Sequence, residues 1–337
     1  MKNFDYFIGI DVSKLTLDVT VLLLQTGKEE LIDYQVIDNN EKRVVSYLEK
    51  VFKGQCFPEN TLFCFEDTGI YSMPLAYILS DQQLNYWQVP ALEIKRSKGI
   101  CRGKSDKTDS KGIALYAFSH LYKLRLSTVS DAVIQKLRLL FSEREKIIKS
   151  LGAFKRTSEN KDFCSKEVFQ SVENINKDIV TQLDNSLKKV EEKLMDIIQE
   201  DEKITQEFEL INSICGVGRY TALYLIICTK GFSCFENWRQ LACYAGVAPF
   251  EYSSGTSVRG KTRVSSLADM KLKSLLNMCA LVAIRRDKEL RGYYERKLAE
   301  GKPKMLVINN VRCKLLARIF AVINRNSPFV NTWKFAG

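Results

Sequence analysis

The sequence predicts a mixed α/β domain followed by two mainly helical segments, an α/β + α organisation. Three observations support this prediction. The first 125 residues alternate between short apolar runs typical of strands and amphipathic stretches typical of helices. Apolar residues then recur every three or four positions over residues 130–205, as in long packed helices. The remaining residues are again helical in pattern and carry the excess of positive over negative charge.

The first domain is predicted to span residues 1–125 and to contain a mixed sheet. Residues 5–24 hold two β-type runs joined by the polar turn DVSK, which predicts a β-hairpin. The further elements expected here are strands at 30–38, 61–66 and 85–90 and helices at 41–52, about 71–80 and about 105–122. A hairpin followed by alternating strands and helices is typical of a sheet with both antiparallel and parallel neighbours.

Residues 126–205 are predicted to form a connector of two long helices with a coiled-coil-like seam. Apolar side chains follow the helical spacing from Val133 to Phe154 and again from Val172 to Ile197. The polar segment KRTSENKD at 155–162 is the expected turn between them. Such a hairpin either packs on its own domain or pairs with another subunit, and the pattern alone favours neither.

The third segment, residues 206–337, is predicted to be helical and basic. Its expected helices are 211–226, interrupted by a glycine turn, 238–249, stopped by Pro249, and roughly 265–285, 288–299 and 304–324. From Gly255 to the end the chain has 18 Lys and Arg against 5 Asp and Glu, a net charge of +13, whereas the first 254 residues carry −2. So uneven a distribution indicates a polyanionic partner, and nucleic acid fits it better than a membrane surface.

Composition argues against several other classes. The apolar runs are too short to span a bilayer, and the N-terminus has no signal-peptide layout, which predicts a cytoplasmic protein. None of the ten cysteines forms a CxxC pair, and there is one histidine, so neither a zinc site nor a disulfide framework is expected.

Four carboxylates are predicted to meet at one edge of the sheet. Asp11 and Glu66 each close an apolar strand, and Asp106 and Asp109 are three apart at the start of a helix. Carboxylates this close together repel one another unless divalent cations neutralise their charge. Sites made only of oxygen ligands suit Mg²⁺ or Mn²⁺. Each residue alone has a simpler explanation: a turn residue, a loop carboxylate, a helix N-cap or a partner of the helix dipole. Their joint order, however, is the layout of a ribonuclease-H-like nuclease core.

At these motifs the sequence resembles a known family. The segments FIGIDVSK, CFEDTGIY and KSDKTDSKGIALYA are similar to the three acidic motifs of the DEDD insertion-sequence transposases, the IS-one-ten family, whose N-terminal domain is RuvC-like. SICGVGRYTALYL, FENWRQLACYAGVAPFEYSSGTSVRG and VSSLADMKLKSLLNMCA resemble its second, transposase domain. Asp67 and Ser110 depart from the family pattern, in which alanine is expected, but both flank the acidic residues rather than replace them.

The resemblance also directs attention to the segment EYSSGTSVRGKTR at 251–263. It implies that Ser254, before Gly255, is a nucleophile, and Arg259, Lys261 and Arg263 follow as candidates for contacting phosphate oxygens. Without the resemblance, a hydroxyl-rich turn that binds the DNA backbone would be preferred. The single histidine, His120, is far away in sequence, so activation would fall to metal ions on the carboxylates.

A glycine turn, CGVG at 215–218, resembles a helix-hairpin-helix turn. Gly216 and Gly218 would let backbone N–H groups approach a DNA phosphate. A plain turn between two helices explains the same four residues equally well.

Together these features predict a DNA transposase or recombinase that uses Mg²⁺ or Mn²⁺ and a phosphoserine intermediate. The resemblance implies donor and target double-stranded DNA, a structured guide RNA encoded by the element, and a homo-oligomer, dimer or tetramer, near the prokaryotic nucleoid. The alternatives are a RuvC-like nuclease or Holliday-junction resolvase using metal-activated water, and a noncatalytic DNA-binding scaffold. An actin-like ATPase is disfavoured, because Val12, Ser13 and Lys14 replace the glycine-rich phosphate turn expected after Asp11.

Overall fold

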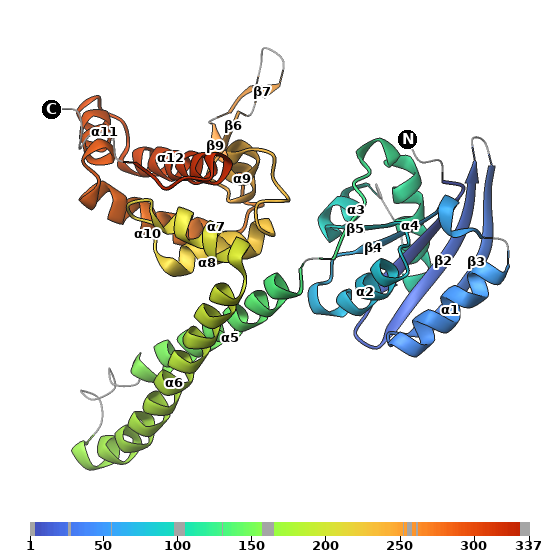
Figure 1. Cartoon of the computed structure of the whole chain (residues 1–337), viewed down its shortest axis with the longest axis horizontal. Coiled ribbons are helices and arrows are strands. Elements are labelled where there is room, and N and C mark those ends of the chain that lie inside the picture. Colours follow the sequence, from blue (N-terminus) through green and yellow to red (C-terminus); the bar gives the residue numbers. More distant parts are fainter. Residues whose placement is uncertain are drawn as a thin grey trace. The chain divides into compact units, whose positions relative to one another are not determined.

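The computed structural model divides the chain into two compact units, Met1–Val129 and Ser130–Gly337 (Figure 1). It describes residues 4–25, 28–54, 56–97, 105–129, 131–156, 165–251, 253–254, 258–260 and 262–330. The two long central helices belong to the second unit. The division at residues 125 and 205 into three parts stays a prediction.

The first unit is built on a five-stranded sheet, which confirms the predicted mixed α/β class. Its strand order is β3-β2-β1-β4-β5, with the first three strands antiparallel and β4 and β5 added in parallel to β1. The strands are β1 (Tyr6–Val12), β2 (Thr16–Gln25), β3 (Lys28–Asp38), β4 (Thr61–Glu66) and β5 (Tyr86–Val89). Because β1 and β4 are parallel neighbours, their carboxyl ends lie at the same edge of the sheet.

Helices cover both faces of this sheet (Figure 1). One face packs on α1 (Glu41–Lys53) and α2 (Met73–Asp81) through a core that includes Ile8, Val19 and Leu79. The other face packs on α3 (Ala91–Ser97), which the sequence did not predict, and α4 (Asp106–Ser119), through Phe7 and Ile113 among others. The alternation of side chains along β1 and β2 therefore decides which residues face α4.

The second unit begins with the predicted helical hairpin, α5 (Ala132–Arg156) and α6 (Lys166–Glu200). The two helices run antiparallel, since Arg144 pairs with Glu191 at 2.8 Å and Lys155 with Asp184 at 3.6 Å. Most of the predicted turn at 155–162 lies outside the described residues. The base of the hairpin joins the main core of the unit through residues such as Leu137, Phe141, Leu194 and Ile198.

The remaining helices of the second unit pack around one core. They are α7 (Glu202–Asn212), α8 (Arg219–Thr229), α9 (Trp238–Tyr244), α10 (Met270–Arg286), α11 (Lys288–Ala299) and α12 (Lys304–Arg325). Helix α9 ends earlier than predicted, because Gly246 takes the left-handed conformation at φ +63° before Pro249 is reached. Among the described residues, none of the helices is both long and apolar enough to cross a membrane.

Candidate catalytic site

Three of the four predicted carboxylates meet at the carboxyl end of β1. Asp11 on β1 and Asp106 and Asp109 on α4 can each offer an oxygen atom, and these atoms lie within 4.8 Å of one another. Asp106 is exposed, and Asp11 and Asp109 are half-buried. We call these three residues the acidic trio. The set contains only carboxylate oxygens, the ligands that Mg²⁺ and Mn²⁺ prefer.

The start of α4 is fixed by its own sequence. Ser105 is the N-cap: its hydroxyl accepts from Thr108 N at 3.3 Å, and Ser105 N donates to Thr108 Oγ1 at 3.1 Å. Asp106 is therefore not the cap, contrary to the simpler explanation of that residue. Instead Asp106 and Asp109 both occupy the first helical turn, where negative charge is stabilised by the helix dipole.

Close contact between α4 and the sheet brings the trio together. A Cβ at Gly9 would lie 2.9 Å from Ala114 Cβ and closer still to Ser110 O and Ala114 N, so only glycine allows this approach. Beside it, the hydroxyls of Thr20 on β2 and Ser110 on α4 are hydrogen-bonded at 2.7 Å, and both residues are buried. Ser110, one of the two departures from the family pattern, thus has a structural partner.

Glu66 lies at the same edge but outside the trio. It is the last residue of β4, and the parallel register pairs Phe65 with Ile10, which places Glu66 beside Asp11 along the neighbouring strand. The next residue, Asp67, accepts hydrogen bonds from Gly69 N at 3.1 Å and Gln88 Nε2 at 3.0 Å. The second departure from the family pattern therefore orders the turn that follows Glu66.

A further carboxylate that sequence reasoning missed lies next to the trio. Asp18 on β2 is directly opposite Asp11 in the antiparallel ladder and is buried. Its Oδ1 accepts from the hydroxyl of Tyr34 on β3 at 2.6 Å. The sequence prediction put the turn at DVSK, residues 11–14, whereas β1 runs on to Val12, which pairs with Leu17. This later turn is what places Asp11 opposite Asp18, so the predicted hairpin would not have paired them.

The predicted serine loop is in fact a short β-hairpin. Strand β6 (Pro249–Phe250) pairs with β9 (Arg263–Val264), and β7 (Ser253–Ser254) pairs with β8 (Val258–Arg259). Ser254 is opposite Val258, and residues 255–257 between them lie outside the described residues. The side chains of Ser254 and Arg259, and the whole of Lys261, lie outside what the structure describes; Arg263 is exposed.

The two glycines of the predicted helix-hairpin-helix turn have different surroundings. Gly216, at φ +95°, packs against α10, where a Cβ would lie 2.7 Å from Ala283 Cβ and 2.8 Å from Cys279 O. Gly218 is the N-cap residue of α8 and has nothing within 4 Å of the Cβ position. The close approach at Gly216 is thus to the protein itself, whereas Gly218 is exposed and its Cβ position is open.

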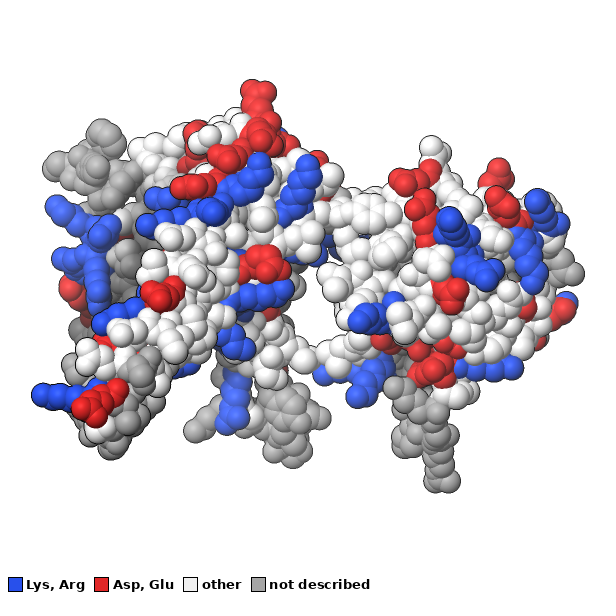
Figure 2. Space-filling view, turned by 90° about the horizontal axis from the view of Figure 1, so that it is seen from below, with Lys and Arg blue, Asp and Glu red and all other residues white. Residues whose placement is uncertain are grey.

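Surface charge does not by itself outline the site. Figure 2 shows Lys and Arg side chains interspersed with Asp and Glu on the visible face, rather than one uniformly basic area.

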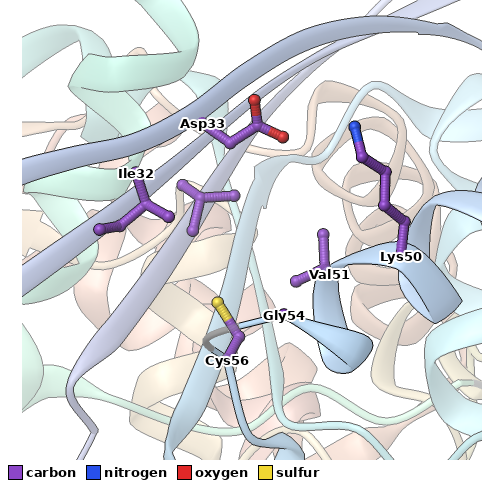
Figure 3. Close-up of a pocket in the computed structure, with 7 residues that line it drawn as sticks. Ile32, Asp33, Lys50, Val51, Gly54 and Cys56 are labelled. Carbon is purple, nitrogen blue, oxygen red and sulfur yellow. The ribbon is translucent and has the colours of Figure 1, made fainter.

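One pocket on the first unit is separate from the trio. This hollow of about 270 Å³ lies between the sheet and α1, with Asp33 from β3 and Lys50 and Cys56 among its lining residues (Figure 3). Val21, which also lines it, belongs to the core on the α1 side, whereas Thr20 contacts α4. Asp33 is consequently a carboxylate of the same sheet on the opposite face.

Comparison with known proteins gives a consistent match along the chain. Residues 8–160 match the DEDD transposase family of the IS110 type, and residues 208–295 match the Transposase IS116/IS110/IS902 family. The pilin gene-inverting protein of Moraxella bovis is 27% identical over 330 residues, which cover 96% of this chain and 97% of that protein. That of Moraxella lacunata is 27% identical over 328 residues, with the same shares covered. An uncharacterized 43.6 kDa protein of the insertion element IS110 from Streptomyces coelicolor is 30% identical over 128 residues, 38% of this chain and 31% of that protein.

Proposed function

The chain belongs to the IS116/IS110/IS902 family of transposases, and from this premise we propose that it moves or inverts a DNA segment by cleaving and rejoining strands. The observation that carries the proposal is the acidic trio at the sheet edge. The relatives that match almost the whole chain are named for gene inversion, which supports site-specific rearrangement as the outcome.

The first unit is proposed to be a RuvC-like, ribonuclease-H-like catalytic domain. Its support is the strand order β3-β2-β1-β4-β5 with antiparallel and then parallel neighbours, and α4 lying across β1. In this arrangement Asp11, Glu66, Asp106 and Asp109 are the residues that would hold Mg²⁺ or Mn²⁺. A divalent cation bound there would polarise the phosphodiester and neutralise negative charge that develops on its oxygen atoms.

Ser254 is proposed to be the nucleophile. Its Oγ attacks the DNA phosphorus and loses its proton, while a deoxyribose oxygen leaves with the bonding electron pair and takes up a proton. The product is a phosphodiester that joins serine to DNA. Rejoining reverses these steps: a hydroxyl from another DNA end attacks the same phosphorus and the serine oxygen leaves. The number of phosphodiester bonds is conserved, so no ATP is required.

Cations in the same hairpin are proposed to bind the phosphate. Arg259, Lys261 and Arg263 follow the serine in sequence, and the ladder pairs Ser253 with Arg259 and Phe250 with Arg263. Guanidinium groups donate two hydrogen bonds to one phosphate and stabilise negative charge in the transition state. The open N-terminal end of α8 at Gly218 is a second proposed contact with the DNA backbone, and the Gly216 turn sets its position.

Further partners follow from the family resemblance. We propose a homo-oligomer, dimer or tetramer, for which exposed apolar side chains on α5 and α6 give support: Leu139, Ile148, Val172 and Ile175. A structured guide RNA encoded by the element would select donor and target DNA. Expression of the chain together with its flanking noncoding DNA tests this proposal, since a defined RNA should copurify with the protein.

A serine variant tests the proposed chemistry. Ser254→Ala should abolish both strand cleavage and the covalent protein–DNA adduct, which is detected with labelled DNA on a denaturing gel. Ser253→Ala is a matched control, since Ser253 is an exposed hydroxyl in the same short strand, and it should keep both activities. Cleavage by Ser254→Ala at the wild-type rate would instead indicate a RuvC-like nuclease or resolvase that uses metal-activated water.

Variants of the acidic trio separate an enzyme from a DNA-binding scaffold. Asp11→Asn and Asp106→Asn should each reduce strand cleavage by at least about 100-fold, because each removes a charge from the set that would hold the cation. DNA binding, measured by gel shift, should persist in both. Unchanged rearrangement in cells with either variant would favour the noncatalytic scaffold.

A further inference from the structure

Asp18 faces the same side of the sheet as the acidic trio. It is directly opposite Asp11 in the β1–β2 ladder, so the two side chains point to the same face with Cβ atoms about 5 Å apart. That face is the one covered by α4, because Thr20, two residues along β2, is hydrogen-bonded to Ser110 of α4. Asp18 is only 8% exposed. The sheet therefore places a buried carboxylate immediately beside a proposed cation ligand.

Tyr34 holds this carboxylate in place. Its hydroxyl donates to Asp18 Oδ1 at 2.6 Å, and Lys107 Nζ lies 5.0 Å from the centre of the Tyr34 ring. The hydrogen bond to Asp18, burial, and the charges of Asp18 and Asp106 raise the pKa of Tyr34 to about 12. The phenol thus remains a hydrogen-bond donor at any physiological pH. The contact with Lys107 places the Tyr34 ring beside the first turn of α4, which also carries Asp106 and Asp109.

The position of this carboxylate suits a role beside a bound cation. Asp18 is buried opposite Asp11, and the Tyr34 hydroxyl fixes its Oδ1. A divalent cation at the trio would be attracted by the charge of Asp18 as well as by the trio itself. Asp18 is not one of the three residues whose oxygens lie within 4.8 Å of one another. It would therefore act on a bound cation indirectly, as a neighbour of the ligand Asp11.

We propose that Asp18, held by Tyr34, is a positioning residue of the cation site. Its negative charge raises the affinity of the trio for a divalent cation, and its place opposite Asp11 restricts the positions open to the Asp11 carboxylate. This inference rests on the proposed function, because it requires the trio to bind a cation. Substitution of residues that contact metal ligands, without binding the metal themselves, commonly changes metal affinity by about 10- to 100-fold.

Metal binding without DNA tests the inference. Mn²⁺ is titrated into the full-length chain, and bound Mn²⁺ is measured by electron paramagnetic resonance. Asp18→Asn should raise the dissociation constant about 10- to 100-fold. Tyr34→Phe should raise it less, since the charge remains and only its fixed position is lost. Asp33→Asn is the matched control, because Asp33 lies on the same sheet but lines the hollow on the α1 side, and it should bind as the wild type does.

The outcomes are distinguishable. If Asp11→Asn loses Mn²⁺ binding and Asp18→Asn binds as tightly as the wild type, the role of Asp18 is refuted while the proposed function stands. If Asp11→Asn binds Mn²⁺ like the wild type, the proposed cation site itself is wrong. Circular dichroism shows whether each variant is folded. If Asp18→Asn does not fold, Tyr34→Phe decides: an unchanged dissociation constant overturns the inference, and a raised one supports it.

Discussion

Substitution of Gly9 by alanine should separate α4 from the sheet. The added Cβ would meet backbone atoms of α4, Ser110 O and Ala114 N, as well as Ala114 Cβ at 2.9 Å. Since comfortable contacts between carbon atoms need about 3.5–4.0 Å, α4 must move outward by about 1 Å. The obstacle is helix backbone rather than a flexible side-chain end, so local rotation cannot relieve the contact.

The cost of this movement is both structural and functional. Overpacking of a core typically costs about 1–3 kcal/mol, and a helix backbone as the obstacle favours the upper end of that range. For a unit of this size, a loss of about 3 kcal/mol lowers the melting temperature by about 10 °C. Asp106 and Asp109 move with α4 while Asp11 stays on β1, and a displacement of about 1 Å in a catalytic arrangement reduces the rate on the order of 100-fold.

The assay combines differential scanning calorimetry of the full-length chain with strand cleavage measured well below the melting transition. Gly152→Ala is the matched control: Gly152 lies within α5 and has nothing within 4 Å of the Cβ position. It should be neutral or stabilising by about 0.5–1 kcal/mol, because alanine favours helix more than glycine does. Wild-type stability and cleavage in Gly9→Ala would refute the argument that this contact sets the geometry of the trio.

Two further predictions concern buried polar groups. Ser110→Ala should lower the free energy of unfolding by about 1–2 kcal/mol, because the buried Thr20 hydroxyl loses its partner. The double variant Thr20→Val with Ser110→Ala should lose less stability than the two single variants added together. Strictly additive free energies of unfolding in urea would contradict this. Burial raises the pKa of Glu207 above its ordinary value near 4.5, with repulsion from Asp201 adding to the effect and Lys203 opposing it. The destabilisation that ionised Glu207 causes is therefore absent below about pH 4.5 and develops as the pH rises through the raised pKa. Glu207→Gln should accordingly increase the melting temperature at pH 8 but not at pH 4. An equal change at both pH values would exclude titration of Glu207 as the cause.

Features set by local sequence were predictable. The ends of β1 and β4 follow from apolar runs that stop at Asp11 and Glu66, and the spacing of Asp106 and Asp109 places them on one helical face. The rule that parallel strands end at a common edge places Glu66 beside Asp11, whereas the trio also depends on the close contact of α4 with β1 at Gly9. The family matches at residues 8–160 and 208–295 agree with the resemblance that these motifs carry.

Features set by tertiary contact were not predictable. Nothing near Gly216 in the sequence indicates that its missing side chain makes room for α10, some 60 residues later. The serine segment was expected to be a loop because it is rich in small polar residues. Instead, residues 249–250 pair with 263–264 and residues 253–254 pair with 258–259, which makes it a hairpin. The role of Asp18 depends on strand register, which a pattern of apolar residues specifies only once the turn between the strands is placed.

The helical hairpin of α5 and α6 has a topological consequence. The chain enters it at Ala132 and leaves it at Glu200, and both ends are at the base, where its core residues join the helices of the second unit. Farther out, Leu151 is buried but does not belong to that core. The outer part of the hairpin thus projects from the core, and the packing of that core does not fix its length. Equal numbers of residues, taken in whole heptads from each helix, can be gained or lost in evolution without disturbing the register of the seam or the core at its base.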